Sequence, residues 1–84
     1  MFYVYVLQSE KDQNFYVGYT SDLRKRFSEH QLGQVRSTCH RLPIKLVYYE
    51  ACINQKDAMK REVYLKTAWG KRYIKNRLRE YLTG

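Results

Sequence analysis

Apolar and aromatic residues alternate in two short runs near the amino terminus, Phe2 to Leu7 and Phe15 to Tyr19. A polar segment, Gln8 to Asn14, separates the two runs. A period of two over such lengths is typical of strands, and two strands joined by a polar loop favour a hairpin. We therefore predict an antiparallel hairpin at the start of the chain.

The alternation also gives the hairpin two faces, and we place Tyr5 opposite Tyr16. One face then carries the apolar set Phe2, Val4, Val6, Phe15 and Val17. The other face carries Tyr3, Tyr5, Tyr16 and Gly18. A slip by one residue would mix the two sets, which burial of one face penalises. We expect the first face to be core and the second to be a row of phenols that ends at a glycine.

The next segment has the period of a helix, with Ser21 as the predicted N-cap and Asp22 in the first turn. One stripe carries Leu23, Arg26, Phe27 and His30. Arg26 and His30 thus occupy positions where the period favours apolar side chains. Because a desolvated guanidinium is costly without an anion, we expect a negatively charged partner for Arg26.

A loop from Gln31 to Pro43 is predicted next, and it is followed by a third strand from Ile44 to Ile53. In this strand Ile44, Leu46 and Tyr48 alternate with Lys45, Val47 and Tyr49. The strand is expected to join the hairpin in one sheet.

Two further helices complete the predicted fold. Asn54 is the predicted N-cap of a helix that reaches about Trp69 and stops at Gly70, a residue type common just after helix ends. Its inward stripe is predicted to be Ala58, Glu62, Leu65 and Trp69. The last helix is predicted from Lys71 to about Leu82, with an inward stripe of Ile74, Leu78, Tyr81 and Leu82. Glu62 is a carboxylate in line with core positions, which is how functional sites often break a pattern.

The elements predict an α/β protein of the α+β type, with a small, mainly antiparallel three-stranded sheet flanked by about three helices. At 84 residues the chain is expected to be one domain, residues 1–84. Nine tyrosines provide large contact areas for so small a core.

The net charge of the chain indicates what kind of partner to expect. Sixteen Lys and Arg residues against eight Asp and Glu give a formal net charge of +8, which favours a polyanionic partner, nucleic acid before an acidic membrane. A membrane anchor is disfavoured because the basic residues are spread over several elements. Two cysteines make no disulfide framework, and we expect no signal peptide, so a reduced cytoplasmic setting is favoured.

Three features of the chain together resemble the GIY-YIG nuclease domain: Tyr3-Val4-Tyr5, Tyr16-Val17-Gly18, and Arg26 ten residues after Tyr16. The family includes homing and restriction endonucleases, the first-incision domain of a bacterial excision-repair subunit, and small stand-alone bacterial proteins. The resemblance covers roughly the whole chain, with Tyr3 in place of the first motif's glycine, as in the stand-alone branch. It implies a metal-dependent endonuclease in DNA repair, recombination or processing.

The resemblance also implies roles for single residues. The motif tyrosines correspond to Tyr5 and Tyr16, which bind or deprotonate the attacking water, and the metal-binding glutamate corresponds to Glu62. His30 matches a histidine one turn after the motif arginine, Arg26. Its residue type also suits a hydrogen-bonded core histidine, and both interpretations stay open. Tyr19 stands where several relatives carry lysine.

The residue chemistry agrees with these roles. Tyrosine is a poor base at its usual pKa of about 10, but nearby cations can lower that pKa. Arg26 has fork-shaped donors that suit a phosphate. Glu62 is a hard oxygen ligand that suits one Mg²⁺ or Mn²⁺ ion, held by a single carboxylate and the substrate phosphate. We therefore expect the carboxylate to face a cation, either Arg26 or a metal ion.

Nucleic acid is the expected partner, DNA more than RNA, and a protein partner is a further candidate for supplying target specificity. We expect the following residues to contact it: Gly18, Tyr19, Arg36, Thr38, Arg41, Lys66 and Asn76. Of these, Asn76 rests only on the resemblance to a third-helix asparagine. The alternative to a nuclease is a binding module that keeps the fold and the basic surface without cleaving.

Overall fold

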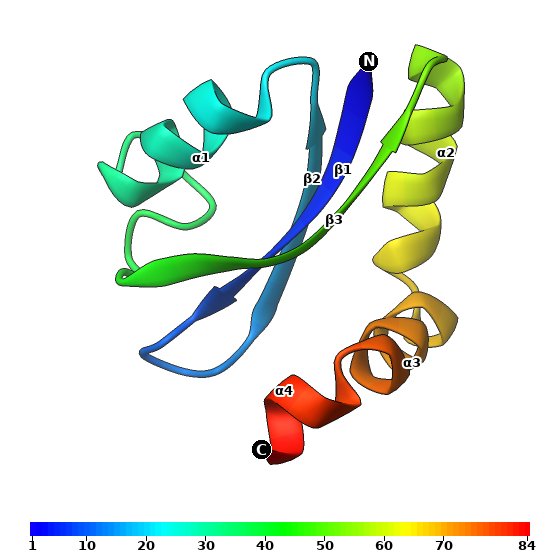
Figure 1. The fold of residues 1–84 in the computed structure, drawn as a ribbon. Coiled ribbons are helices and arrows are strands. Elements are labelled where there is room, and N and C mark those ends of the chain that lie inside the picture. The colour runs from blue at the N-terminus through cyan, green and yellow to red at the C-terminus, as the bar shows by residue number, and fades with distance from the viewer.

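The computed structural model describes all 84 residues, and its centre is a three-stranded antiparallel sheet. The strands are β1 (Phe2–Ser9), β2 (Phe15–Thr20) and β3 (Ile44–Cys52). Their order is β2-β1-β3, so β1 lies in the middle and β2 forms one edge (Figure 1). The predicted fold class and all three predicted strands are confirmed, with β3 ending one residue earlier than expected.

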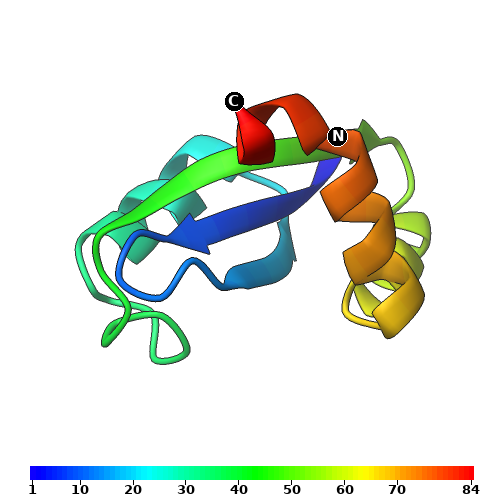
Figure 2. The same ribbon diagram turned by 90° about the horizontal axis from the view of Figure 1, so that it is seen from below.

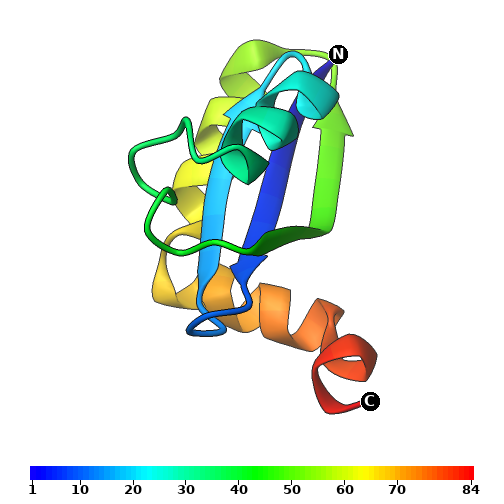
Figure 3. The same ribbon diagram turned by 90° about the vertical axis from the view of Figure 1, so that its left-hand side faces the viewer.

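Helices cover both faces of the sheet. Helix α1 (Leu23–Gln31) lies on one face, and α2 (Gln55–Leu65) with α3 (Ala68–Arg77) covers the other, as Figure 3 shows from the side. Consequently β1 is buried on both faces: Val4 and Val6 pack toward α2 and α3, while Tyr5 and Leu7 pack toward α1. The tyrosine face is therefore part of a second small core and not an open row of phenols.

The hairpin register differs from the predicted one. Tyr5 pairs with Gly18, and Tyr16 pairs with Leu7. The prediction that Tyr5 lies opposite Tyr16 is wrong by two residues. Because side chains alternate between faces at every residue, an even shift keeps each residue on its predicted face. The shift has a local consequence, because the ring of Tyr5 then lies against Gly18, which has no side chain.

Strand β3 contains an irregularity that simple alternation missed. Val6 pairs with Tyr48 and Leu7 pairs with Leu46, so Val47 is an extra residue in β3. Such a β-bulge changes which face the following side chains occupy. Ile44 and Leu46 pack on the α1 side, whereas Tyr48 packs on the α2–α3 side. The prediction that Tyr48 shares a face with Ile44 and Leu46 is wrong for this reason.

The helix starts are set by side-chain caps. Asp22, one residue after the predicted Ser21, caps α1, because its carboxylate accepts a hydrogen bond from the Lys25 N–H at 3.1 Å. Asn54 caps α2 as predicted, accepting from the Lys56 N–H at 2.8 Å.

The end of α2 was predicted incorrectly. Helix α2 stops at Leu65, and Thr67 caps α3 by accepting from the Gly70 N–H at 3.2 Å. Gly70 therefore lies in the first turn of α3. A Cβ atom at Gly70 would collide with the Tyr64 carbonyl oxygen and the Leu65 backbone, so glycine here permits close packing of α3 on the end of α2. The glycine marks a helix crossing and not a C-cap.

The chain ends in a short helix, α4 (Arg79–Thr83), separated from α3 at Leu78. Figure 2 shows α4 beside the sheet, where the Tyr81 hydroxyl donates to Gln8 Oε1 at 2.6 Å. Ile74 is buried as predicted, but Trp69, Tyr81 and Leu82 are exposed. The shifted helix boundaries explain the error, because a stripe continued through a break no longer faces one side. None of the helices is long and apolar enough to cross a membrane.

Candidate active site

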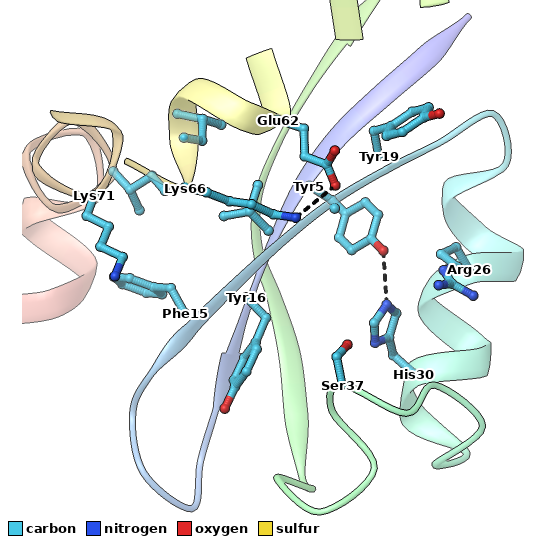
Figure 4. A pocket seen from close by; sticks show the side chains of 14 residues that line it. Tyr5, Phe15, Tyr16, Tyr19, Arg26, His30, Ser37, Glu62, Lys66 and Lys71 are labelled. Atoms are coloured by element: carbon cyan, nitrogen blue, oxygen red, sulfur yellow. Dashed lines mark hydrogen bonds and ion pairs between the residues drawn. The ribbon is translucent and has the colours of Figure 1, made fainter. Parts of the chain in front are cut away.

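A pocket lies across the edge strand β2 and collects residues from both sides of the sheet (Figure 4). Helix α1 contributes residues on one side, and α2 and α3 contribute residues on the other. Eight residues predicted from the sequence line this one pocket: Tyr5, Tyr16, Gly18, Tyr19, Arg26, His30, Glu62 and Lys66. The three motifs, which are far apart in sequence, thus meet at the exposed edge of the sheet.

A hydrogen-bonded chain runs from the pocket into the core. The Tyr5 hydroxyl lies 3.0 Å from His30 Nε2, and His30 Nδ1 lies 2.7 Å from Thr38 Oγ1. All three side chains are buried. His30 is therefore both a hydrogen-bonded core histidine and a residue that lines the pocket, so the two interpretations of this residue are compatible.

The protonation of this chain follows from its burial. Burial raises the pKa of Tyr5 above its usual value, although the Arg26 guanidinium acts to lower it. Desolvation outweighs the guanidinium, so this nearby cation does not bring the pKa of Tyr5 below its usual value. Burial, together with Arg26, lowers the pKa of His30, so its imidazole is neutral at pH 7. A neutral phenol thus faces a neutral imidazole.

Arg26 has an anionic partner, but it is not the expected one. Its Nη1 lies 3.0 Å from Glu29 Oε1, one helical turn away on α1. The hydrogen bond that Arg26 donates to Glu29 raises the pKa of Arg26, and the nearby Tyr5 hydroxyl adds to this effect. A guanidinium has five N–H donors, so a single bond to Glu29 leaves others for an anion in the pocket.

Glu62 reaches the pocket from α2, across β2 from Tyr5 (Figure 4). Its Oε2 lies 3.3 Å from the Nζ of Lys66, one turn further on, and the Glu62 side chain is only 19% exposed. Its negative charge acts on Tyr5, whose pKa it helps to raise. The sequence predicted that Glu62 faces Arg26 or a metal ion. In the structure, Lys66 is the cation that contacts its carboxylate.

The donor set of the pocket suits one kind of metal ion. No group of three or more His, Cys, Asp or Glu side chains gathers in this structure, whereas Mg²⁺ commonly binds through one or two carboxylates, water and substrate phosphate. Glu62 fits that role. The Lys66 side chain is 55% exposed and belongs to a surface ion pair that contributes little, so an ion could take its place on the carboxylate.

Gly18 makes room for this arrangement. It pairs directly with Tyr5 in the sheet, and a Cβ atom at Gly18 would collide with the Tyr5 hydroxyl and lie 2.6 Å from its Cζ. The glycine therefore allows the phenol to lie over the β2 backbone and to reach His30.

Several predicted nucleic-acid contacts lie outside the pocket. Thr38 is fully buried and bonded to His30, so its expected contact with phosphate conflicts with its position. Arg41 forms an ion pair with Asp12, Nε to Oδ2 at 3.1 Å. Arg36 and Asn76 are exposed but do not line the pocket. Their role in binding stays a prediction.

The structure adds Lys71 and Phe15 to the pocket, and from the loop it adds Ser37. The sequence prediction began the last helix at Lys71, so it did not indicate which side of the helix this lysine faces. Thr67 was the missed signal, because a threonine cap there starts the helix earlier and fixes which side Lys71 faces.

Comparison with known proteins identifies the class of this domain. A sequence model described as the GIY-YIG catalytic domain matches residues 1–79, almost the whole chain. The chain therefore belongs to the GIY-YIG family, a superfamily of nucleases that generally use divalent metal ions, and the resemblance inferred from the tyrosine motifs is confirmed.

Within this family the chain is similar to UPF0213 proteins. It is 40% identical over 65 residues to one from Streptococcus pneumoniae, covering 76% of this chain and 65% of that protein. It is 43% identical over 67 residues to one from Clostridium perfringens, covering 79% and 71%. The first match thus spans just under two thirds of its relative. The solution NMR structure of the Bacillus halodurans UPF0213 protein has a TM-score of 0.55 and 32% identity, covering 88% of this chain and 82% of that one.

Proposed function

We propose that this protein is an endonuclease that hydrolyses nucleic-acid phosphodiester bonds with one Mg²⁺ or Mn²⁺ ion. One observation carries the proposal: Tyr5, His30 and Arg26 line one side of a pocket whose other side presents the carboxylate of Glu62. The net charge of +8 favours a polyanionic substrate. We favour DNA over RNA, in repair, recombination or processing, with a protein partner as a candidate source of target specificity.

The Tyr5–His30–Thr38 chain provides a route for the proton of the attacking water. As the water oxygen bonds to phosphorus, the phenol oxygen of Tyr5 takes the water proton and passes its own proton to His30 Nε2. This requires the tautomer in which His30 Nδ1–H donates to Thr38 Oγ1, a contact of 2.7 Å. The lowered pKa of His30 keeps Nε2 free to accept, and the high pKa of Tyr5 matters less because the phenol is never left as a phenolate.

The remaining residues act on charge and position. Arg26 donates to the phosphoryl oxygens as they gain negative charge, an interaction that strengthens in the transition state. Tyr16 contacts the substrate further along β2. Glu62 is the residue that would hold the metal ion, which would supply Lewis-acid stabilisation of the departing oxygen. Lys66, released from Glu62, becomes a phosphate contact, as do Gly18 through its backbone and Tyr19 at the rim.

The test is cleavage of labelled DNA duplexes, flaps and four-way junctions with Mg²⁺, compared with Glu62→Gln. Because Glu62 is the only carboxylate in the pocket, Glu62→Gln should lower cleavage by about 10³-fold, equivalent to the several kcal/mol that a metal ion provides. The matched control is Glu80→Gln, which removes an exposed carboxylate on α4 and should cut like the parent.

Binding separates the two outcomes. The proposal predicts that Glu62→Gln still binds DNA while losing cleavage. A parent protein that binds in a salt-sensitive way but leaves every substrate intact, with or without Mg²⁺ and Mn²⁺, would instead establish a binding module that keeps the nuclease fold.

A further inference from the structure

The candidate pocket does not end at Tyr16 but continues along the edge of the sheet toward α4. Tyr16 and Lys71 line the pocket and also the next hollow, to which Lys75 contributes. Phe15 and Lys75 then line a third hollow together with Arg79. The three hollows adjoin one another at these shared residues, and we refer to them together as the groove. Figure 3 shows α3 and α4 leading away from the hairpin end.

The α3–α4 wall of this groove carries cations that have no anionic partner. Lys71, Lys75 and Arg79 are exposed, and none forms an ion pair, whereas Arg26, Arg61 and Lys66 each pair with a glutamate. Helix α3 contains no Asp or Glu at all. Lys71 and Lys75 lie one turn apart on the same helix face, about 6 Å along the axis. Such unpartnered charges in a row attract an extended polyanion.

The opposite wall offers different chemistry. Phe15 and Tyr16 line it from β2, with their rings toward opposite faces of the sheet, and Gln13 and Asn14 line it from the hairpin loop. Cations on one wall and aromatic rings on the other are the combination that binds single-stranded nucleic acid, because phosphates follow the charges while bases stack on the rings. A duplex keeps its bases stacked on one another and cannot use the rings in this way.

We propose that this groove, formed by Phe15, Tyr16, Lys71, Lys75 and Arg79, holds a single-stranded segment of the substrate on one side of the scissile phosphate. The inference rests on the proposed function, since the groove begins at the pocket where that phosphate would bind. It assigns a substrate class, a duplex with a single-stranded extension, and it gives α3 and α4 a role in binding that the GIY-YIG motifs do not include.

Binding is measured in the Glu62→Gln background, so that substrates stay intact, by fluorescence anisotropy of labelled DNA over a range of salt concentrations. The probes are a blunt duplex and the same duplex with a single-stranded extension on either strand end. The test variant is K71Q/K75Q/R79Q. The control variant, R24Q/K56Q/K60Q, removes the same number of exposed Lys and Arg charges away from the groove.

We expect the parent to bind one extended duplex about 10-fold more tightly than the blunt one. The groove variant should lose that preference, and its salt slope should fall by about 2, since each single-strand phosphate contact contributes about 0.7. The control variant should keep the preference. Equal affinity of the parent for blunt and extended duplexes, or an equal loss in both variants, would overturn the inference.

Two further measurements keep the outcome clear. A charge-preserving variant, K71R/K75R/R79K, should bind like the parent, which tests for charge and not for damage to the fold. If the triple variant unfolds, Lys75→Gln alone should still lower the slope by about 0.7.

The two proposals fail separately. A parent that cuts, with cleavage independent of the extension, removes this inference and leaves the proposed nuclease. A parent that never cuts but prefers extended DNA through the groove removes the nuclease and leaves the groove.

Discussion

Two clusters in this molecule are built from the same kinds of residue but differ in what their polar groups contact. The open cluster, Tyr5, Arg26, His30 and Glu62, lines the pocket across β2. The closed cluster, Tyr48, Glu50, Arg61 and Tyr73, joins β3 to α2 and α3. Each contains an arginine, a carboxylate and a buried or half-buried phenol.

In the closed cluster the polar groups form hydrogen bonds and ion pairs with one another. Arg61 donates from Nε and Nη2 to the two oxygens of Glu50, both at 2.9 Å. The Tyr48 hydroxyl donates to Glu50 Oε2 at 2.9 Å and lies 3.1 Å from the Tyr73 hydroxyl. The guanidinium also lies 4.7 Å from the centre of the Tyr73 ring. The carboxylate and the guanidinium therefore have each other as partners, in the bidentate geometry that fixes both most strongly.

The open cluster divides its charges among neighbours. Arg26 makes one bond to Glu29, and Glu62 makes one contact to the ammonium group of a half-exposed lysine. Burial raises the pKa of both Tyr5 and Tyr48, but Tyr5 faces a neutral histidine that can accept a proton, whereas Tyr48 faces a carboxylate already bound by arginine. Residue types alone thus do not mark a site. A site is marked by hydrogen-bond donors and acceptors that line a pocket and are not used up by contacts within the protein.

The largest expected effect comes from exchanging the two arginines for glutamine. Arg26→Gln should lower cleavage by about 10²- to 10³-fold, as loss of one transition-state donor does, and should cost less than about 0.5 kcal/mol of unfolding free energy, since it breaks only a surface pair on α1. Arg61→Gln should cost about 1–3 kcal/mol by leaving Glu50 and its hydrogen bonds unsatisfied. Its cleavage rate should stay within about twofold.

Single-turnover cleavage and urea unfolding of both variants measure the two quantities. If Arg61→Gln lost as much cleavage as Arg26→Gln at temperatures where both are folded, the clusters would not differ as proposed.

The parts of the fold that follow local rules were predicted well. The three strands, the Asn54 cap and the α1 stripe depend on periodicity and capping, which each segment carries in its own sequence. The hairpin register was missed by two residues because alternation has a period of two and cannot detect an even shift. The bulge at Val47 was missed since it depends on how β3 fits β1.

The same limit applies to the candidate site. The motif residues Tyr5, Tyr16, Arg26 and Glu62 were selected from spacing, and they line one pocket. The prediction missed their pairwise contacts, although Arg26–Glu29 and Glu62–Lys66 have the i,i+3 and i,i+4 spacings at which charged side chains meet on a helix. Thr38 joins the site through the path of a loop, which no periodicity describes.

An intermediate effect is expected from adding one methyl group to the open cluster. Gly18→Ala would push against the phenol of Tyr5, which is buried and cannot move freely. Overpacking of this kind costs about 1–3 kcal/mol, and displacing Tyr5 from His30 should lower cleavage about 10-fold or more. Tyr48→Phe is the matched change in the closed cluster, since it removes two hydrogen bonds and should cost about 1 kcal/mol without affecting cleavage.

A double-mutant cycle with Tyr5→Phe identifies the cause. Gly18→Ala should cost less stability in the Tyr5→Phe background, because the hydroxyl that it meets is absent. Equal costs in both backgrounds would show that Gly18 is needed for some other reason.

The smallest expected effect is on how the free energy of unfolding depends on pH. The two clusters should affect it in different pH ranges. Burial, with Arg26 contributing, lowers the pKa of His30, so the unfolded chain binds a proton at this residue more readily than the folded protein does. The free energy of unfolding should therefore fall as pH drops below about 6.5 and level off once the folded protein is protonated as well. For Glu50, burial alone would raise the pKa, but the hydrogen bonds with Arg61 and Tyr48 outweigh it, so the pKa is lowered. The stability that Glu50 contributes should therefore be lost only as pH falls below about 4.5 through that lowered pKa.

Urea unfolding of the parent, His30→Gln and Glu50→Gln at fixed pH values between 3 and 8 measures both dependences. His30→Gln should flatten the curve just below pH 6.5, and Glu50→Gln should flatten it below pH 4.5, each variant leaving the other region unchanged. His40→Gln is the control, because His40 is exposed on its loop and should keep the slope of the parent. A His30→Gln protein with the slope of the parent between pH 5 and 7 would mean that this imidazole is not held neutral in the fold. The proton route from Tyr5 would then lack its acceptor, and the distinction between an open and a closed cluster would lose its chemical basis.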